Sequence, residues 1–192
     1  MEPLFAHVPG LTVLSPSNAQ SAYDLTLQAI SYNNPVVILE PLSQYHVKTS
    51  LDTSVRTYHL GKAHIKKTGS DITIVTFGGM LDKTETALAH PDLSEVDYEL
   101  IDLSTLSPID YPTILQSVKK TGRLVIIQES CLNCSIAQAI SSTLMKEAFT
   151  YLRGPCEIVS SPDCITPYFR NTDSFLPSSL AIKNACSMVM TY

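Results

Sequence analysis

Residues 11–39 read LTVLSPSNAQSAYDLTLQAISYNNPVVIL, and this stretch decides the fold of the first part of the chain. The β-leaning segment 11–14 predicts a short strand. Apolar residues at helical spacing predict a helix over 18–30, which ends near Pro35 because the residue before a proline is pushed out of the α region. The continuous apolar run 36–39 predicts a second strand, covered on both faces. Together these elements predict a βαβ unit with a right-handed crossover.

The start of the predicted helix carries a local signal. Ser17, followed by Gln20 three residues later, matches a capping box, in which the serine side chain satisfies a free helical N–H group. The apolar face of this helix consists of Ala22, Leu25, Ala29 and Ile30. A single βαβ unit leaves its strands unpaired, so we expect 11–14 and 36–39 to expose apolar edges. These edges predict a dimer or a larger oligomer.

The rest of the chain alternates strands with helices. Apolar runs predict strands at 72–76, 98–103, 124–127 and 156–159, and helical spacing predicts helices at 80–89, 110–120, 135–149 and 180–190. This alternation is typical of an α/β three-layer sandwich, a sheet with helices on both faces. Residues 41–57 are polar, without helical or strand period, and suit an interdomain linker. Gly78 and Gly79, after the strand 72–76, suit either a turn or the close approach of a ligand.

Composition excludes several classes of function. The chain has 192 residues, of which 44% are hydrophobic and 16% charged, as in an ordinary core-forming protein. A net charge of -5 provides no basic surface for nucleic acid. No apolar run approaches the roughly 20 residues that span a bilayer, and the N-terminus lacks the layout of a signal peptide. These features predict a soluble protein with neither nucleic acid nor membrane as a partner.

Sequence spacing alone identifies no catalytic set. Cys131 and Cys134 form a single C-x-x-C among five cysteines. With no second pair and no nearby histidine, this favours a strand-to-helix loop with reduced thiols over a zinc site, and a redox pair is the alternative. The chain has no P-loop, no G-x-G-x-x-G and no G-x-S-x-G, and its five histidines have no metal-ligand spacing.

Seven segments follow one another in an order that carries a family resemblance: HVPGLTVLSPS, NNPVVILEP, LGKA, GSDITIVTFG, IDLSTLSPID, TILQSVKKTGRLVIIQE and EAFTYLRGP. In these segments the chain resembles the β subunit of thiamine-diphosphate-dependent 2-oxo acid dehydrogenases, from residue 3 to about 190. The F-A-H-x-P-G segment and the stretch from I-L-E-P to Tyr45 are closest to the branched-chain (2-oxoisovalerate) type. The pyruvate type shares most of the same positions.

The resemblance implies a domain layout. Residues 1–45 resemble the end of a thiamine pyrimidine-binding domain, 46–56 a linker, and 57–192 a transketolase C-terminal-like domain. The family's glutamate that contacts the aminopyrimidine ring belongs to the front of the first domain, which we expect to be missing here. Thiamine diphosphate and Mg²⁺ are therefore implied only for the full assembly, where an α subunit holds most of their contacts. We expect the isolated chain to be inactive.

The resemblance also implies site residues. His7, in the H-x-P-G turn, matches a family histidine that lines the channel to the thiamine, and imidazole suits proton transfer near neutral pH. A loop histidine that caps backbone groups is the alternative. The turn before N-P-V implies ligands of a structural K⁺ ion: the carbonyl of Ala29, Tyr32 where an aspartate is usual, and Asn34. A plain helix C-terminus is the alternative there.

Departures from the family pattern fall on the surface where the family's C-terminal domain meets its partners. Ser104 stands where the family has an arginine, and Cys134 with Ser135 replaces a glycine pair. Docking of the family's acyltransferase core pairs acidic side chains with a basic partner. Glu147 and the terminal carboxylate of Tyr192 are the candidate docking groups.

The sequence therefore predicts the C-terminal portion of a 2-oxo acid dehydrogenase β subunit. In the complete complex it would serve oxidative decarboxylation and acyl transfer to lipoamide, with an α subunit or α portion, a second β copy and the lipoyl acyltransferase core as partners. The alternatives are a non-catalytic subunit-interaction module, or the C-terminal domain of a transketolase or deoxyxylulose-phosphate synthase. The resemblance implies the cytoplasm in a bacterium and the mitochondrial matrix in a eukaryote.

Overall fold

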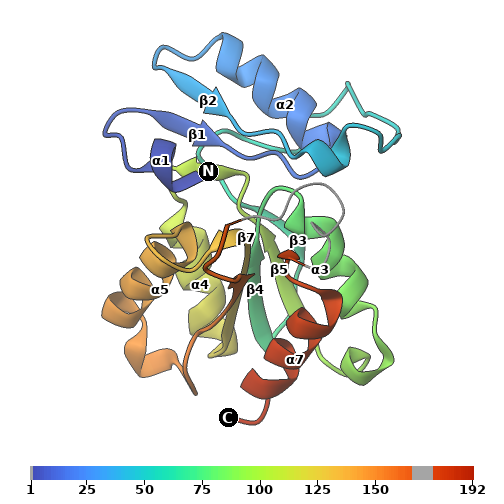
Figure 1. Cartoon of the computed structure of the whole chain (residues 1–192), viewed down its shortest axis with the longest axis vertical. Coiled ribbons are helices and arrows are strands. Elements are labelled where there is room, and N and C mark those ends of the chain that lie inside the picture. The colour runs from blue at the N-terminus through green and yellow to red at the C-terminus, as the bar shows by residue number, and fades with distance from the viewer. Residues whose placement is uncertain (1, 166–174) are drawn as a thin grey trace.

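The computed structural model describes residues 2–165 and 175–192, which form a small sheet above a larger one (Figure 1). The elements of the small sheet are β1 (Thr12–Leu14), β2 (Val36–Ile38) and β6 (Thr105–Ser107). Strand β1 lies in the centre, parallel to β2 and antiparallel to β6. The prediction that β1 has an unpaired edge is therefore wrong, because β6 comes from the second half of the chain to pair with it. The edge strands of this sheet are β2 and β6, and β2 is half-buried rather than covered on both faces.

Helix α2 (Ala19–Ile30) follows β1 as predicted, but its cap differs. The N-cap is Asn18, whose side chain accepts the N–H of Ser21, while the Ser21 hydroxyl accepts the N–H of Asn18. The Ser17 hydroxyl instead donates to Asp102. Asparagine and serine are equally good caps, so the local signal could not separate them. At the other end, Ile30 is 78% exposed rather than buried.

The large sheet has the strand order β3-β5-β4-β7-β8, and all its pairs are parallel except β3 with β5. Its strands are β3 (His64–Lys67), β4 (Ile72–Thr76), β5 (Tyr98–Asp102), β7 (Leu124–Cys131) and β8 (Glu157–Ser161). Figure 1 shows α4 (Tyr111–Thr121) and α5 (Ile136–Glu147) on one face, and α3 (Met80–Leu88) and α7 (Ser179–Val189) on the other. These layers confirm the predicted α/β sandwich.

Short elements complete the described chain: α1 (Glu2–Ala6), η1 (Leu42–Gln44), η2 (Pro91–Leu93) and η3 (Phe149–Tyr151). Helix α4 begins and ends as the sequence predicts. Asp110 accepts the N–H of Thr113, and Gly122 takes a left-handed φ of 72°. No helix within the described ranges combines the length and apolar character needed to cross a bilayer.

The core lies on both faces of the large sheet, because side chains alternate along each strand. Val75, Ile101 and Ile126 pack toward α4 and α5, in a cluster that includes Val13 of the small sheet. Ile74 and Leu100 pack toward α3 and α7. Each side chain buried in this way contributes about 1.5–3 kcal/mol of transfer free energy. The cluster on the α5 face therefore joins the two sheets, and the division at residues 45 and 57 stays a prediction.

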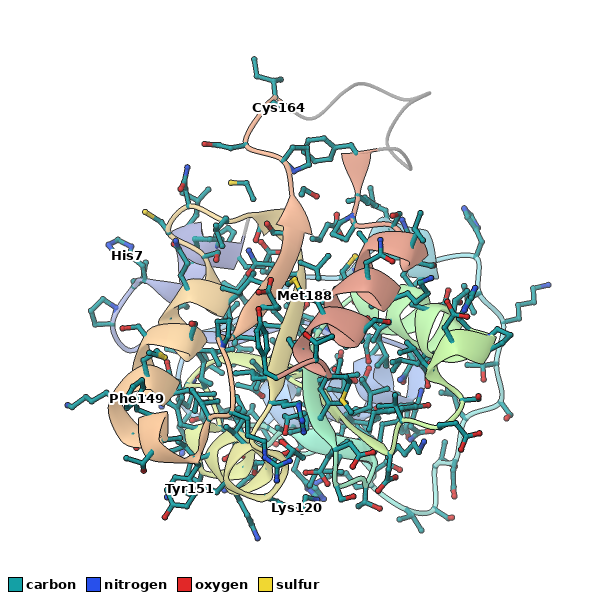
Figure 2. The ribbon with its side chains drawn as sticks, turned by 90° about the horizontal axis from the view of Figure 1, so that it is seen from below. His7, Lys120, Phe149, Tyr151, Cys164 and Met188 are labelled. Atoms are coloured by element: carbon teal, nitrogen blue, oxygen red, sulfur yellow. The ribbon has the colours of Figure 1, made fainter. Side chains whose placement is uncertain are left out.

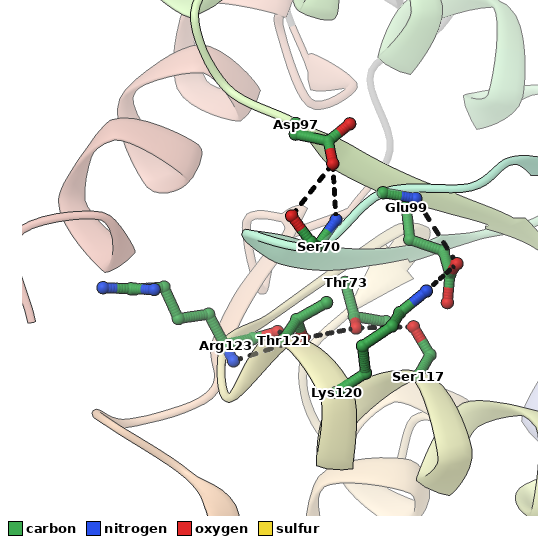
Figure 3. Close-up of polar contacts among 9 residues, drawn as sticks. Ser70, Thr73, Asp97, Glu99, Ser117, Lys120, Thr121 and Arg123 are labelled. Carbon is green, nitrogen blue, oxygen red and sulfur yellow. Dashed lines mark hydrogen bonds and ion pairs between the residues drawn. The ribbon is translucent and has the colours of Figure 1, made fainter.

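Polar side chains at the amino ends of the parallel strands bond to one another (Figure 3). The Thr73 hydroxyl lies 2.7 Å from that of Ser117 and 2.8 Å from that of Thr121. The nearly buried Glu99 accepts the ammonium of Lys120 at 2.5 Å. At this edge of the sheet, the buried polar side chains shown in Figure 3 form hydrogen bonds or ion pairs with other residues of the protein.

Candidate functional site

His7 lies in the turn that follows α1, and its side chain is exposed. Figure 2 shows it at the periphery, pointing away from the ribbon. It borders a cavity of about 500 Å³, whose other walls are the Ser107–Pro108 segment and the start of α5 at Ser135 and Ile136. A histidine in this position can exchange protons with a molecule that enters the cavity.

The loop from Cys131 to Cys134 contributes Cys134 to the lining of this cavity, and a buried amide holds the loop. Gln128 donates to the carbonyls of Ser130 and Cys131 at 3.2 and 2.9 Å, and accepts the N–H of Ala137 at 3.0 Å. Both cysteines are free thiols, and Cys134 takes a φ of 55°. Within the described ranges, no group of three or more His, Cys, Asp or Glu residues could hold a metal ion.

The predicted K⁺ ligands lie in the turn between α2 and β2. The carbonyl of Ala29 accepts the N–H of Tyr32 at 3.2 Å, as in an ordinary helix C-terminus. Tyr32 and Asn34 are both exposed. This geometry does not decide between the cation site and the plain helix end, and the potassium site stays a prediction.

The two predicted docking groups lie on different elements. Glu147 ends α5 and is exposed, and the aromatic residues Phe149 and Tyr151 just beyond it are 63% and 51% exposed (Figure 2). Tyr192 follows α7, and its carbonyl oxygen accepts Nη2 of Arg123 at 3.1 Å. Arg123 also holds the Val189 carbonyl at 3.0 Å, so the segment after α7 is fixed to the sheet.

The glycine pair after β4 approaches the chain's own side chains. A Cβ at Gly78 would lie 2.8 Å from Oγ of Ser15, and one at Gly79 would lie 2.9 Å from Oγ of Ser43. Both glycines line a cavity of about 680 Å³, together with Glu129. Burial raises the pKa of Glu129, and the nearby Glu2 carboxylate raises it further. The pair therefore allows close packing between the two sheets next to an acidic cavity.

Sequence reasoning missed a buried carboxylate at the end of β5. Asp102 has no exposed surface and accepts the Ser17 hydroxyl. Burial raises its pKa to about 7, although the hydroxyls of Ser17, Tyr58 and Ser104 oppose this shift. The Tyr58 hydroxyl accepts the Asn18 amide at 2.9 Å, and burial followed by the Asp102 charge raises the pKa of Tyr58 to about 12. The sequence signal that could have identified Asp102 is an acidic residue at the end of a predicted buried strand.

Comparison with known proteins supplies a family. Residues 61–182 match the family described as transketolase, C-terminal domain. The chain is 38% identical over 189 residues to the pyruvate dehydrogenase E1 component subunit beta of Rickettsia conorii, covering 98% of this chain and 58% of that protein. It is 35% identical over 191 residues to the acetoin:2,6-dichlorophenolindophenol oxidoreductase subunit beta of Cupriavidus necator, covering 99% of this chain and 56% of that protein.

A solved structure has the same fold. A split-gene transketolase, described as an inactive β4 tetramer, superimposes with a TM-score of 0.80 and 21% sequence identity, over 98% of this chain and 60% of that one. At this identity the likeness concerns the fold alone. The chain thus spans somewhat more than half the length of the β subunits that it resembles.

Proposed function

Because this chain belongs to the transketolase C-terminal domain family, we propose that it serves as the C-terminal part of the β subunit of a thiamine-diphosphate-dependent 2-oxo acid dehydrogenase. The observation that carries the proposal is the alignment of 98% of the chain with a β subunit at 38% identity. The names of the relatives favour pyruvate over 2-oxoisovalerate as the substrate. In the complete complex, the acyl group would pass to lipoamide. The two relatives described above are bacterial, so we propose a cytoplasmic location.

The chain's own residues would contribute part of the active site. Thiamine diphosphate supplies the carbanion chemistry when it is bound. His7, at the rim of a cavity, offers an imidazole that can hold or release a proton near the reacting groups. Within the described ranges, no group of three or more His, Cys, Asp or Glu residues is arranged to hold a metal ion. We therefore assign the Mg²⁺ and diphosphate contacts to an α subunit, and expect the isolated chain to be inactive.

A structural K⁺ ion is proposed in the turn after α2. The carbonyl of Ala29 has a second lone pair beside the N–H bond that it accepts. Tyr32 could contribute its backbone carbonyl, and Asn34 its side-chain oxygen. Such oxygen-only ligand sets suit hard cations.

Three partners are proposed on separate surfaces. The open edge of β2, beside the exposed Leu27 and Ile30, would meet a further strand or a second β copy. The cavity beside His7 would face the α subunit. The acyltransferase core would dock on the surface that contains Glu147 and Tyr192.

Reconstitution tests the proposal. The chain would be co-expressed with a dehydrogenase α subunit and with the front part of a β subunit that carries the thiamine-facing glutamate. With thiamine diphosphate added, 2-oxo acid decarboxylation would be measured for the His7→Ala variant, with His46→Ala as the exposed-histidine control. We expect His7→Ala to lower kcat at least tenfold, with little change in α-subunit binding. Equal activity of the two variants would remove His7 from the mechanism.

A second candidate function is a non-catalytic subunit-interaction module. The departures of Ser104, Cys134 and Ser135 from the family pattern favour it. Contrary to the expectation that all three lie on the partner-facing surface, only Cys134 is exposed, whereas Ser104 and Ser135 are buried. This candidate predicts stable α-subunit binding by light scattering without any decarboxylation. Turnover in the reconstituted complex would reject it.

A further inference from the structure

Unpartnered buried polar atoms gather at one edge of the large sheet. Among the described residues, five side chains have a buried oxygen without a hydrogen-bond partner: Thr76, Asp102, Ser104, Ser130 and Ser161. All five lie at or just beyond the carboxyl ends of β4, β5, β7 and β8. Ligands of open α/β sheets bind outside this edge. The amino edge, by contrast, satisfies its buried polar groups internally (Figure 3).

Three of these side chains, those of Thr76, Asp102 and Ser104, lie together at the carboxyl ends of β4 and β5. Thr76 and Asp102 are register partners in the parallel pair of β4 and β5, so their side chains stand on the same face. Ser104 follows Asp102 by two residues, and its hydroxyl is near enough to affect that carboxylate, although the two do not meet hydrogen-bond geometry. Their neighbours Val75 and Ile101 pack toward α4 and α5. The side chains of Thr76 and Asp102 therefore face the side of the sheet that α3 and α7 cover.

Among the described residues, no cation contacts the carboxylate of Asp102. The Ser17 hydroxyl satisfies Oδ2, whereas Oδ1 has no partner. Lys66 is the nearby cation, but its ammonium pairs with Glu85 at 2.9 Å. Burying a carboxylate without a counter-charge is costly, and such groups are normally paired or bound to a metal ion. Ser104 itself stands where the family pattern has an arginine.

We propose that Thr76, Asp102 and Ser104 form a binding site for a monovalent alkali cation, K⁺ or Na⁺. The donors are all oxygens, which hard cations prefer. A single carboxylate balances a single positive charge, whereas Ca²⁺ sites usually gather several carboxylates. A cavity of about 390 Å³ lies next to the site: Ser17 lines this cavity and donates its hydroxyl to Asp102, whereas Thr76, Asp102 and Ser104 lie behind its wall.

Thermal and urea unfolding of the full chain would test the site in KCl, NaCl and choline chloride at equal ionic strength. A cation at ten times its Kd should lower the unfolding equilibrium constant about 11-fold. Asp102→Asn keeps the shape of the side chain and removes its charge, so this variant should lose most of the effect. Glu95→Gln is the matched control, because it also converts a carboxylate to an amide, but at an exposed position outside both proposed cation sites, and it should keep the effect.

Crystals soaked in RbCl give a direct readout on the unaltered chain. We expect an anomalous peak within bonding distance of Oδ1 of Asp102 and of the Thr76 and Ser104 hydroxyls. A water molecule without anomalous signal at that position would overturn the proposal. An Asp102→Asn variant that retains the full cation effect, or a Glu95→Gln variant that abolishes it, would also overturn it.

Discussion

The hydroxyl of Ser17 donates a hydrogen bond to the carboxylate of Asp102, 85 residues further along the chain. Ser17 precedes the helix that covers the small sheet, and Asp102 ends a central strand of the large sheet. This bond therefore links the two sheets through a buried charge. Hydrogen bonds to charged groups contribute about 1.5–3 kcal/mol, more than those between neutral groups.

Replacement of Ser17 by alanine should destabilise the chain by about 1–3 kcal/mol, because the buried carboxylate loses its donor. Ser161→Ala is the matched control. Its hydroxyl is equally buried but has no partner, so its removal should be nearly neutral. Urea unfolding midpoints would compare the two variants, and equal losses would contradict the assigned strength of the Ser17–Asp102 bond.

Alanine substitutions at Gly78 and Gly10 would distinguish the cost of backbone strain from the cost of steric crowding. Both have left-handed φ angles, of 56° and 81°. A Cβ at Gly78 would meet Ser15, whereas a Cβ at Gly10 would meet nothing within 4 Å. Gly10→Ala should therefore cost about 1–2 kcal/mol through strain, and Gly78→Ala about 1–3 kcal/mol more through crowding. Thermal unfolding would show the difference, and similar losses would argue against tight packing at Gly78.

The Glu99–Lys120 pair should make stability depend on pH. Burial alone would raise the pKa of Glu99, but the hydrogen bond from Lys120, with further help from Ser117, outweighs this and lowers it. A carboxyl with a lowered folded pKa stabilises the protein above its unfolded pKa, and the contribution is lost as pH falls through the folded value. The stabilising contribution of Glu99 is therefore lost below about pH 4.5.

Glu99→Gln should lower stability at pH 7 and flatten the decline of stability between about pH 5 and 3. Glu95→Gln, at an exposed position, is the control and should keep the decline of the unaltered chain. Urea midpoints measured across this range would check both variants. An unchanged slope in Glu99→Gln would show that other carboxyl groups carry the acid sensitivity.

Gln128 should control the Cys131–Cys134 loop. Gln128→Leu leaves the N–H of Ala137 and two carbonyls without partners, so we expect a loss of about 1–3 kcal/mol. Cys131 should then react faster with a thiol reagent. Gln138→Leu, at an exposed position of α5, is the control. Unchanged thiol reactivity in Gln128→Leu would mean that the loop holds its shape without the amide.

Local patterns were enough to predict most elements. The run Ile72–Thr76 was predicted as a strand with the bounds that the structure has, because a continuous apolar β-branched segment has few other stable conformations. The helix predicted over 110–120 likewise corresponds to α4, whose ends carry the local cap residues Asp110 and Gly122. The α/β fold class followed from the alternation of strand patterns and helix patterns along the chain.

Tertiary contacts decided the rest. Strand β6 has three residues and no period of its own, and it exists because β1 pairs with it. The choice between Ser17 and Asn18 as the helix cap depended on Asp102, which no local pattern could place beside them. The cluster of Thr76, Asp102 and Ser104 depends on the register of β4 with β5. Sequence periods determine which residues become strands and helices, because those preferences are local. Which polar groups meet, and which are left without a partner, depends on pairing between distant segments, and only the folded structure fixes it.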